Sequence, residues 1–353
     1  MAWVSALQRP PLPTLLAEQA GRIAALRAEL GGSLPPEADD VWLLRYVLSF
    51  SSRPAEAAQA AQKALAWRAE NRDFIEAAEA RRLPPGLSTD DLRLLQTLLV
   101  SGFHYATQFG DAVFVIRAGQ CNQGPALDML GEQKVELWLN YLSECAWQYC
   151  DAVTRQKQYF VKQVTLQDFT SAAMSQDRRF FKVLSRSSKM NEWLRPQLLG
   201  RAIFFNTPSW MSWIFAIASN FISQKTLAKV WVHRQAVGSS SGQLCPYAQD
   251  LFGGPARLPT LFGGSCDCVD RQGCVNGMSN DYYGKRTTDD VANSSCEILA
   301  LLRLPRPEDL EKAPVNSGRT ADLPASPVRV ELQNSCWRRC CLKRRPLAAS
   351  VDT

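Results

Sequence analysis

The stretch Arg201–Lys229, RAIFFNTPSWMSWIFAIASNFISQKTLAK, decides how this chain is interpreted. It opens with an apolar run of strand length, Ala202–Phe205, and a break centred on Pro208 follows. The next segment, Ser209–Ile222, is a helix candidate that is rich in aromatic residues and contains no charged residue. We therefore expect a strand, a break and an apolar helix, and the function depends on what that helix covers.

Three interpretations of this apolar helix follow from the sequence. A transmembrane helix needs about 20 apolar residues, and Ala202–Gln224 carries no charge. Polar residues and Pro208 interrupt that run, which disfavours a membrane span. A buried core helix of an α/β domain is the second interpretation. We favour the third, a helix that closes an apolar cavity, because a protein rarely keeps so apolar a helix beside polar breaks with nothing apolar behind it.

Length and composition limit the class of protein. The chain has 353 residues, which suits one large domain or two with a tail, and its apolar content of 46% is ample for a packed core. Its net charge of +6 is modest, and basic residues are dense only near the C-terminus, which disfavours a nucleic-acid binder. The first residues show no basic segment followed by an apolar one. We therefore expect no secretory signal, reduced cysteines and a cytoplasmic protein.

The first 85 residues predict helices only. Asp39 and Asp40 are N-cap candidates for one helix, and Pro54 can open another without losing a hydrogen bond. The run Leu83–Gly86 is typical of a linker, and Ser88 is the N-cap candidate of the next helix. The expected helices are Thr14–Leu30, Val41–Phe50, Ala55–Arg72 and Thr89–Val100.

From residue 100 onward, strands and helices alternate. The expected strands are Ala112–Arg117, Phe160–Leu166, Ala202–Phe205 and Lys229–His233. The expected helices between them are Leu127–Cys150, Asp177–Trp193 and Ser209–Ile222. Strands separated by helices of this length need crossover connections, so we expect an α/β domain with a mostly parallel sheet. Beyond about Cys268 the sequence is rich in Gly, Asn, Ser, Pro and charge, which predicts a largely disordered tail.

Several motifs occur along this layout in a fixed order. They are Leu43–Tyr46 (LLRY), Ala64–Arg68 (ALAWR), Gly110–Arg117 (GDAVFVIR), Val164–Asp168 (VTLQD), Pro196–Val232, and Leu258-Pro259 followed by Phe262–Gly264. In this order they resemble the CRAL-TRIO lipid-binding family, the group of the yeast secretory phosphatidylinositol-transfer protein and of the tocopherol and retinaldehyde binders. The resemblance implies a CRAL-TRIO N-terminal helical module at 14–85, a lipid-binding domain at 88–268 and a tail at 269–353.

The resemblance also implies an architecture. A small N-terminal helical bundle packs on an α/β bowl whose floor is the sheet and whose interior is an apolar pocket. A mobile helix closes the pocket and opens at a membrane. Each buried CH₂ of a lipid is worth about 0.8 kcal/mol, so the lipid exchanges only while the protein touches a bilayer. In this sequence the gate corresponds to Ser209–Ile222, with the gate and pocket residues Trp210, Trp213, Phe215, Ile217 and Phe221.

A site for a polar headgroup is implied after the gate. In the phosphatidylinositol-binding members a Thr, a Lys and a Glu contact the headgroup, and this sequence has Thr226, Lys229 and, in place of the Glu, Gln197. Family arginines correspond to positions near the apolar Leu48 and Phe50. These departures leave the ligand open between phosphatidylinositol, another phospholipid and an apolar ligand such as a sterol, tocopherol or retinoid. An ordinary strand-edge lysine is the alternative for Lys229.

We expect no catalytic site. The run Gly238–Gly242 (GSSSG) fits the G-x-S-x-G pattern of a hydrolase nucleophile. Both histidines of the chain, His104 and His233, precede Ser240, whereas that hydrolase order needs a His after the Ser. The sequence therefore predicts a flexible Ser-Gly loop and a protein that is not an enzyme and needs no cofactor beyond its bound lipid.

Four cysteines are candidate metal ligands: Cys266, Cys268, Cys274 and Cys296. The first three are spaced as C-x-C and C-x₅-C, whereas common zinc sites use paired C-x₂-C motifs. On spacing alone, the sequence predicts unpaired thiols and no metal.

The C-terminal run Cys336–Arg345 combines three cysteines with five basic residues. Basic charge attracts anionic lipid, and acylation of cysteine would add the second signal that stable membrane attachment needs. A solvated basic tail is the alternative. The possible acylation sites are Cys336, Cys340 and Cys341.

These observations predict a cytoplasmic protein, peripheral to membranes, that extracts, holds and delivers or presents one hydrophobic ligand. A phospholipid such as phosphatidylinositol is the first choice. The partners are then a lipid and a membrane surface, and not a nucleic acid. The rival hypothesis is a scaffold or signalling module that no longer exchanges lipid and recruits protein partners through its tail.

Overall fold

The computed structural model describes residues 9–31, 34–51, 53–173, 177–210, 224–233 and 247–268, with short pieces at 237, 245, 273–275, 285, 287–289 and 302–303. None of the helices within these ranges is long and apolar enough to cross a membrane.

Five helices form the N-terminal part of the fold. They are α2 (Leu12–Leu30), α3 (Asp40–Ser49), α4 (Pro54–Glu70), α5 (Arg72–Glu79) and α6 (Thr89–Leu98). The predicted starts are confirmed: the Asp39 side chain accepts the N–H of Trp42, and Ser88 forms a capping box with Asp91. The prediction missed α5, because this helix of 8 residues starts directly after Asn71, with no proline or Ser/Asp cap to mark it.

A sheet of six strands lies at the centre, in the order β5-β4-β3-β2-β1-β6. The strands are β1 (Ser101–Ala106), β2 (Ala112–Arg117), β3 (Gln163–Asp168), β4 (Leu199–Phe205), β5 (Val230–Val232) and β6 (Leu302–Arg303). All neighbours pair in parallel except β1 and β2, so the prediction of a mostly parallel sheet is confirmed. The prediction missed β1, because its sequence, SGFHYA, is too polar to be read as an apolar strand.

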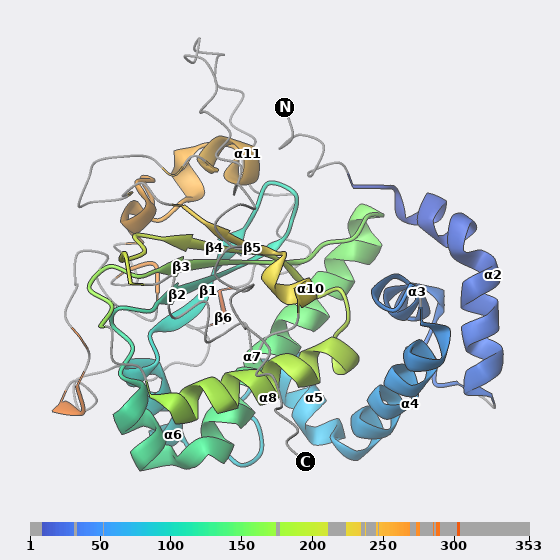
Figure 1. The fold of residues 1–353 in the computed structure, drawn as a ribbon, viewed down its shortest axis with the longest axis horizontal. Coiled ribbons are helices and arrows are strands. Elements are labelled where there is room, and N and C mark those ends of the chain that lie inside the picture. The colour runs from blue at the N-terminus through green and yellow to red at the C-terminus, as the bar shows by residue number, and fades with distance from the viewer. Residues whose placement is uncertain are drawn as a thin grey trace, which may run out of the picture. The chain divides into compact units, whose positions relative to one another are not determined.

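Helices and short turns cover both faces of the sheet (Figure 1). On one side lie the long α7 (Gln123–Lys157), which bends at Gly131 with φ 76°, and α8 (Arg178–Leu194). On the other side lie α11 (Ala248–Phe252) and the short 3-10 helices η1 (Pro255–Arg257) and η2 (Thr260–Phe262). The four-residue α10 (Gln224–Leu227) precedes β5.

The alternation of side chains along the strands divides the core in two. In β2, Phe114 packs in the cluster that includes the N-terminal helices, α7 and α8. Its neighbours Val113 and Val115 point to the opposite face and pack in the cluster that includes α11 and η2. The N-terminal helices thus share a hydrophobic cluster with one face of the sheet.

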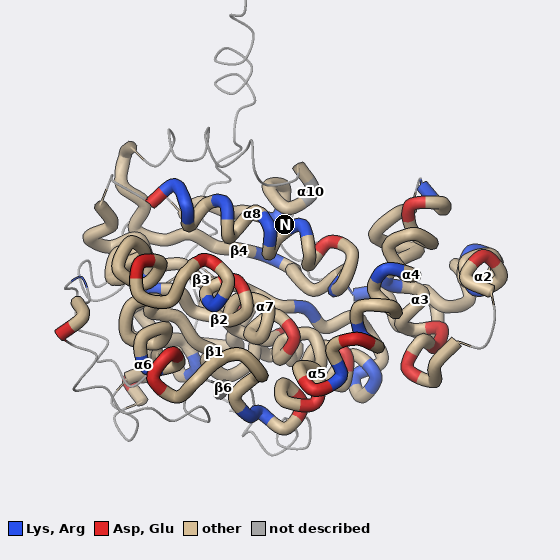
Figure 2. The backbone as a smooth tube through the Cα atoms, turned by 90° about the horizontal axis from the view of Figure 1, so that it is seen from below, with Lys and Arg blue, Asp and Glu red and all other residues tan. Residues whose placement is uncertain are grey.

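Charged contacts reinforce this helical side. Arg179 and Arg186 of α8 pair with acidic side chains of α7. Figure 2 shows basic positions along α8. Arg45 of α3 is fully buried, pairs with Asp151 of α7 at 2.9 Å and lies over the Trp147 ring at 4.6 Å. The LLRY motif therefore fastens the N-terminal helices to α7.

Candidate functional site: a cationic pocket

A pocket of about 390 Å³ opens where the parallel strands β3, β4 and β5 begin. The residues before and at the start of these strands form one wall, and the N-terminal helices form another. The lining residues are Arg9, Pro10, Leu15, Leu48, Asp111, Phe160, Lys162, Val164, Gly200, Arg201, Lys229, Trp231 and Leu251. Most of its wall is apolar, and its charged groups are mostly cations.

The charges of the lining do not balance. Among its described residues, Arg9, Lys162, Arg201 and Lys229 are cations, and Asp111 is the only carboxylate, which leaves a surplus of three positive charges. The Asp111 carboxylate is buried and is bound by the guanidinium of Arg9. It also accepts the backbone N–H of Lys162 at 2.8 Å. Asp111 thus offsets one of the four positive charges of the described lining, and the net charge of that lining stays positive.

Lys162 is the most perturbed of these cations. Burial, followed by the nearby charge of Lys229, lowers the pKa of Lys162 to about 8. Its Nζ donates to the Gln197 Oε1 at 2.7 Å, and the Gln197 Nε2 donates to the Ser49 Oγ at 2.9 Å. Gln197 adopts a positive φ of 67° just after α8. It therefore links the pocket lysine to helix α3.

Arg201 and Lys229 come from adjacent parallel strands. The Arg201 guanidinium lies over the Trp231 ring at 4.3 Å, and burial lowers its pKa. The Lys229 Nζ donates to the carbonyl oxygen of Leu199 at 2.8 Å. Both groups are partly buried in the pocket wall, where an attraction to an anion is less screened than on an open surface.

The structure places the three predicted headgroup residues differently. Lys229 lines the pocket, and Gln197 is one hydrogen bond away through Lys162. Thr226 lies in α10, where its carbonyl accepts the N–H of Lys229 at 3.0 Å, and it is not in the lining. Leu48, near which the resemblance predicts a family arginine position, also lines the pocket.

Several predicted residues lie outside the described part of the chain. Of the gate residues, the half-buried Trp210 is described. The other gate residues, Trp213, Phe215, Ile217 and Phe221, lie outside the described residues. The same holds for the possible acylation sites Cys336, Cys340 and Cys341, for the Gly238–Gly242 run and for Cys296.

Sequence reasoning missed three pocket cations, Arg9, Lys162 and Arg201. Arg201 and Lys162 carry a usable signal, since each stands at the start of an apolar strand where a buried charge is unusual. Arg9 gives no such signal, because it reaches Asp111 from a segment remote in the sequence.

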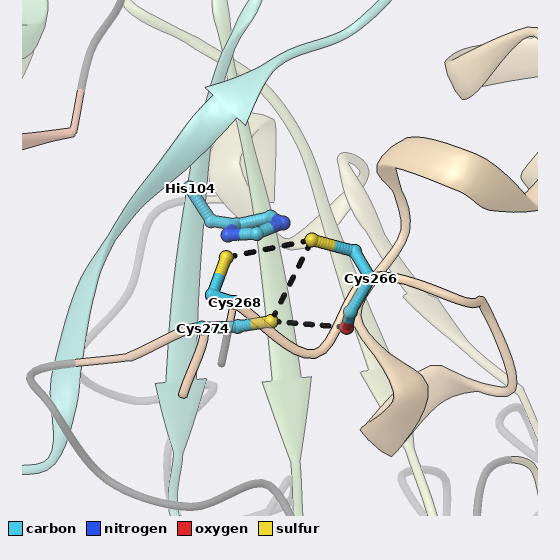
Figure 3. A group of neighbouring side chains, drawn as sticks. All are labelled: His104, Cys266, Cys268 and Cys274. Carbon is cyan, nitrogen blue, oxygen red and sulfur yellow. Dashed lines mark hydrogen bonds between the residues drawn. The ribbon is translucent and has the colours of Figure 1, made fainter. Parts of the chain in front are cut away.

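A second group of side chains gathers at the β1 edge of the sheet. His104 of β1 meets Cys266, Cys268 and Cys274 from the segment that follows η2 (Figure 3). The sequence singled out these cysteines but not His104, which is remote in the sequence and lies in the strand that was not predicted.

Comparison with known proteins identifies the domain that carries the pocket. Residues 97–246 match the CRAL/TRIO domain. This chain contains a CRAL/TRIO domain. Within the CRAL/TRIO domain lie the pocket residues Asp111, Lys162, Arg201 and Lys229, whereas Arg9 precedes it.

Two curated relatives share this similarity. "Protein real-time" of Anopheles gambiae is 24% identical over 252 residues, which are 69% of this chain and 34% of the relative. "Phosphatidylinositol/phosphatidylcholine transfer protein SFH11" of Arabidopsis thaliana is 24% identical over 181 residues, which are 49% of this chain and 45% of the relative. The chain thus spans less than half the length of either relative.

Among solved structures, the "Crystal structure of Sfh5" is 17% identical to this chain. The match has a TM-score of 0.48 and covers 77% of this chain and 90% of that one.

Proposed function

We propose that this protein binds a phospholipid and transfers or presents it at a membrane surface, with the phosphate of the headgroup in the cationic pocket. The observation that carries the proposal is the surplus of three positive charges around a pocket whose one carboxylate is engaged by Arg9. The name of the Arabidopsis relative, a transfer protein for phosphatidylinositol and phosphatidylcholine, supports the same class of ligand.

The chemistry of the lining supports phosphate as the recognised group. An ammonium and a guanidinium donate several charge-assisted hydrogen bonds, which phosphate oxygens accept. The volume of about 390 Å³ falls in the usual range for small-molecule sites. Apolar side chains such as Phe160, Leu48 and Leu251 line the same pocket and can contact the apolar part of a lipid.

The environment of Gln197 favours recognition through the phosphate over recognition through inositol hydroxyls. Its amide oxygen accepts from Lys162, and its amide nitrogen donates to Ser49. Gln197 thereby orients a pocket cation, and its own polar atoms are engaged. Phosphatidylinositol is then one of several phospholipids that the pocket accepts.

The work of the pocket is binding, without chemical turnover. Its described lining contains no His, Ser or Cys that could act as a nucleophile or as a general base at neutral pH. We place the protein in the cytoplasm, in peripheral contact with membranes. Trp213, Phe215 and Phe221 form the gate in this proposal, and acylation of Cys336, Cys340 and Cys341 strengthens the contact.

The direct test is lipid capture. The full chain is incubated with liposomes that contain equal amounts of phosphatidylinositol, phosphatidic acid, phosphatidylserine and phosphatidylcholine, is separated from them, and is analysed by native mass spectrometry. We expect one phospholipid per chain. Protein that retains no lipid overturns the proposal and supports the scaffold hypothesis, and a retained sterol, tocopherol or retinoid supports an apolar ligand.

The gate is tested by the rate of exchange. Trp213→Asp places a charge where an apolar side chain is expected to enter the bilayer, so transfer of a fluorescent phospholipid between vesicles should slow at least tenfold. The control is Trp193→Phe, a change on α8, which should transfer at the wild-type rate. Equal rates for all three proteins would remove the gate from the proposal.

A further inference from the structure

The group of His104, Cys266, Cys268 and Cys274 is compact and mostly buried. One ligand atom from each residue lies within 4.8 Å of those of the other three. His104 and Cys274 are fully buried, Cys268 is 7% exposed and Cys266 is half-buried. Figure 3 shows the imidazole of His104 beside the three sulfur atoms, which come from the segment that follows η2.

The hydrogen bonding of His104 leaves one nitrogen for a ligand. Its Nε2 lies 3.2 Å from the carbonyl oxygen of Arg257. A carbonyl only accepts, so Nε2 carries the proton and Nδ1 of the neutral ring has a lone pair. That buried Nδ1 has no hydrogen-bond partner among the described residues. Metal-bound histidines show this arrangement, in which the second ring N–H donates to a carbonyl or carboxylate.

The sulfur separations fit coordination and exclude a disulfide in this structure. The Sγ atoms of Cys266 and Cys268 are 3.4 Å apart, and those of Cys266 and Cys274 are 4.0 Å apart. Zinc–sulfur bonds of about 2.3 Å in a tetrahedron put the sulfurs about 3.8 Å apart, a value between the two distances. A disulfide would need about 2.05 Å, and none of the three cysteines is disulfide-bonded in the described part of the chain.

We propose that these four residues bind one Zn²⁺ in a closed Cys₃His site. On binding, the three thiols release three protons to solvent and become thiolates, the neutral imidazole binds through Nδ1, and no electron is transferred. Three thiolates and one imidazole in a tetrahedron suit zinc, and four protein ligands leave no position for a substrate. The site is therefore structural.

The sequence around Cys266 is built to hold this geometry. Cys266 donates its N–H to the carbonyl of Leu258 at 3.1 Å and accepts from Thr260 at 2.9 Å. Between them the chain turns through Gly264, where a Cβ would lie 1.9 Å from the Leu258 oxygen. The turn therefore requires glycine, and the Leu-Pro…Gly-Gly motif presents Cys266 toward His104.

The metal would add a cross-link between two parts of the fold that already share a hydrophobic cluster. His104 lies on β1, whose outer neighbour is the two-residue β6. The cysteines follow residue 246, where the match to the CRAL/TRIO domain ends. Zinc thus fastens the segment after the domain to the edge of the sheet, as a cross-link that is independent of the lipid pocket.

The site is tested first on the unaltered full chain. Protein expressed with ZnCl₂ and passed over a weak chelating resin should contain one zinc per chain by plasma mass spectrometry. Its X-ray absorption should show three sulfurs near 2.3 Å and one nitrogen near 2.0 Å. A zinc content below one tenth per chain, or a shell of oxygen and nitrogen alone, overturns the proposal, as does a disulfide between these cysteines in protein prepared under reducing conditions.

Variants then identify the ligands by cobalt spectroscopy. Protein loaded with CoCl₂ should show sulfur-to-cobalt charge transfer and the visible bands of tetrahedral Co²⁺. His104→Cys should shift these bands toward those of a four-sulfur site without loss of stoichiometry, and Cys266→Ser should lose most of the charge-transfer intensity.

The matched control is Cys121→Ser, because Cys121 donates to carbonyls of Val100 and Arg117 and a serine can do the same. It should leave the spectrum unchanged. If His104→Cys and Cys266→Ser also leave the spectrum unchanged, the metal lies elsewhere and the assignment fails. A variant that does not fold leaves the X-ray absorption of the unaltered chain as the deciding measurement.

Discussion

Two cationic sites in the described part of the chain differ in what neutralises their charges. Behind the sheet, the fully buried Glu144 of α7 accepts from Arg68 and from Arg195, each at 2.8 Å. Burial raises the pKa of Glu144, but the charges of Arg195 and Arg68 outweigh it and hold the pKa below its usual value. In the pocket, by contrast, Lys162, Arg201 and Lys229 line a space in which Asp111, the one carboxylate among the described lining residues, is bound by Arg9.

The difference separates a structural site from a binding site. The Glu144 cluster joins α4, α7 and the turn after α8, and both of its guanidinium groups share one buried carboxylate inside the protein. The pocket keeps a positive surplus that an external anion can neutralise. Arg195 and Gln197, two residues apart in one motif, belong to the two different sites.

The largest effect should come from removing the acid of the structural cluster. Glu144→Gln leaves the buried Arg195 and the half-buried Arg68 without their carboxylate, so we expect the free energy of unfolding to fall by about 3–5 kcal/mol. Urea denaturation followed by far-UV circular dichroism measures it. Glu136→Gln, which removes an outer ion pair with Arg186, is the control and should cost at most about 1 kcal/mol. Equal costs for the two variants would contradict the structural role.

A smaller effect, on binding and not on stability, should come from the pocket. Arg201→Ala and Lys229→Ala should each weaken binding of phosphatidic acid or phosphatidylinositol about tenfold, which is about 1.4 kcal/mol per variant, because each removes charge-assisted donors. Competition between lipids in vesicles, with the retained lipid counted by mass spectrometry, measures the change.

The control for these variants is Lys189→Ala, an exposed lysine on α8 outside the pocket lining. It should bind lipid as the wild type does. If Lys189→Ala and the pocket variants lose the same amount, the effect is one of net charge, and the distinction between the two cationic sites does not hold.

The sequence predicted the pocket only in part, for reasons that particular residues make clear. Apolar runs predicted β2, β3, β4 and β5, and family position pointed to Lys229. Arg201 directly precedes one of those predicted strands, Ala202–Phe205. Nothing in the local sequence indicates that the neighbouring strand carries a lysine, Lys229, at the same edge of the sheet. Register and crossover order, which are properties of the whole sheet, bring the two together.

Contacts between remote segments were beyond sequence reasoning. Glu144 looks like one more polar residue of a long helix, and only packing reveals that it faces Arg68 and Arg195. The spacing of the cysteines differs from that of common zinc sites, so the sequence predicted no metal. The fourth residue of the group, His104, lies in a strand too polar to be recognised, so the sequence did not point to it. Spacing rules describe ligands supplied by one segment and fail when a sheet edge supplies one of them.

The smallest effect should be a pH dependence of lipid binding that comes from Lys162. Its pKa of about 8 lies below the ordinary value of about 10.4, so it loses its proton as pH rises from about 7 to 9. An anionic headgroup binds the protonated form better, so affinity for phosphatidylinositol, whose phosphodiester keeps a constant charge in this window, should fall several-fold. Lys229, Arg45, Asp111 and Arg9 also act on this group. Equilibrium binding to vesicles at a series of pH values measures the fall.

Two variants attribute this pH dependence to Lys162. Lys162→Met should bind lipid more weakly at pH 7, and its affinity should not fall between about pH 7 and 9, because the titrating amine is gone. Gln197→Glu places a carboxylate at the atom that accepts from the Lys162 Nζ, so the pocket gains an internal partner of the kind that Glu144 provides behind the sheet. That carboxylate raises the pKa of Lys162 and lowers the positive surplus by one charge. Binding should weaken two- to threefold at pH 7, and the fall should move to higher pH. An unchanged profile in both variants would assign the pH dependence to another group and leave Lys162 with a purely structural role.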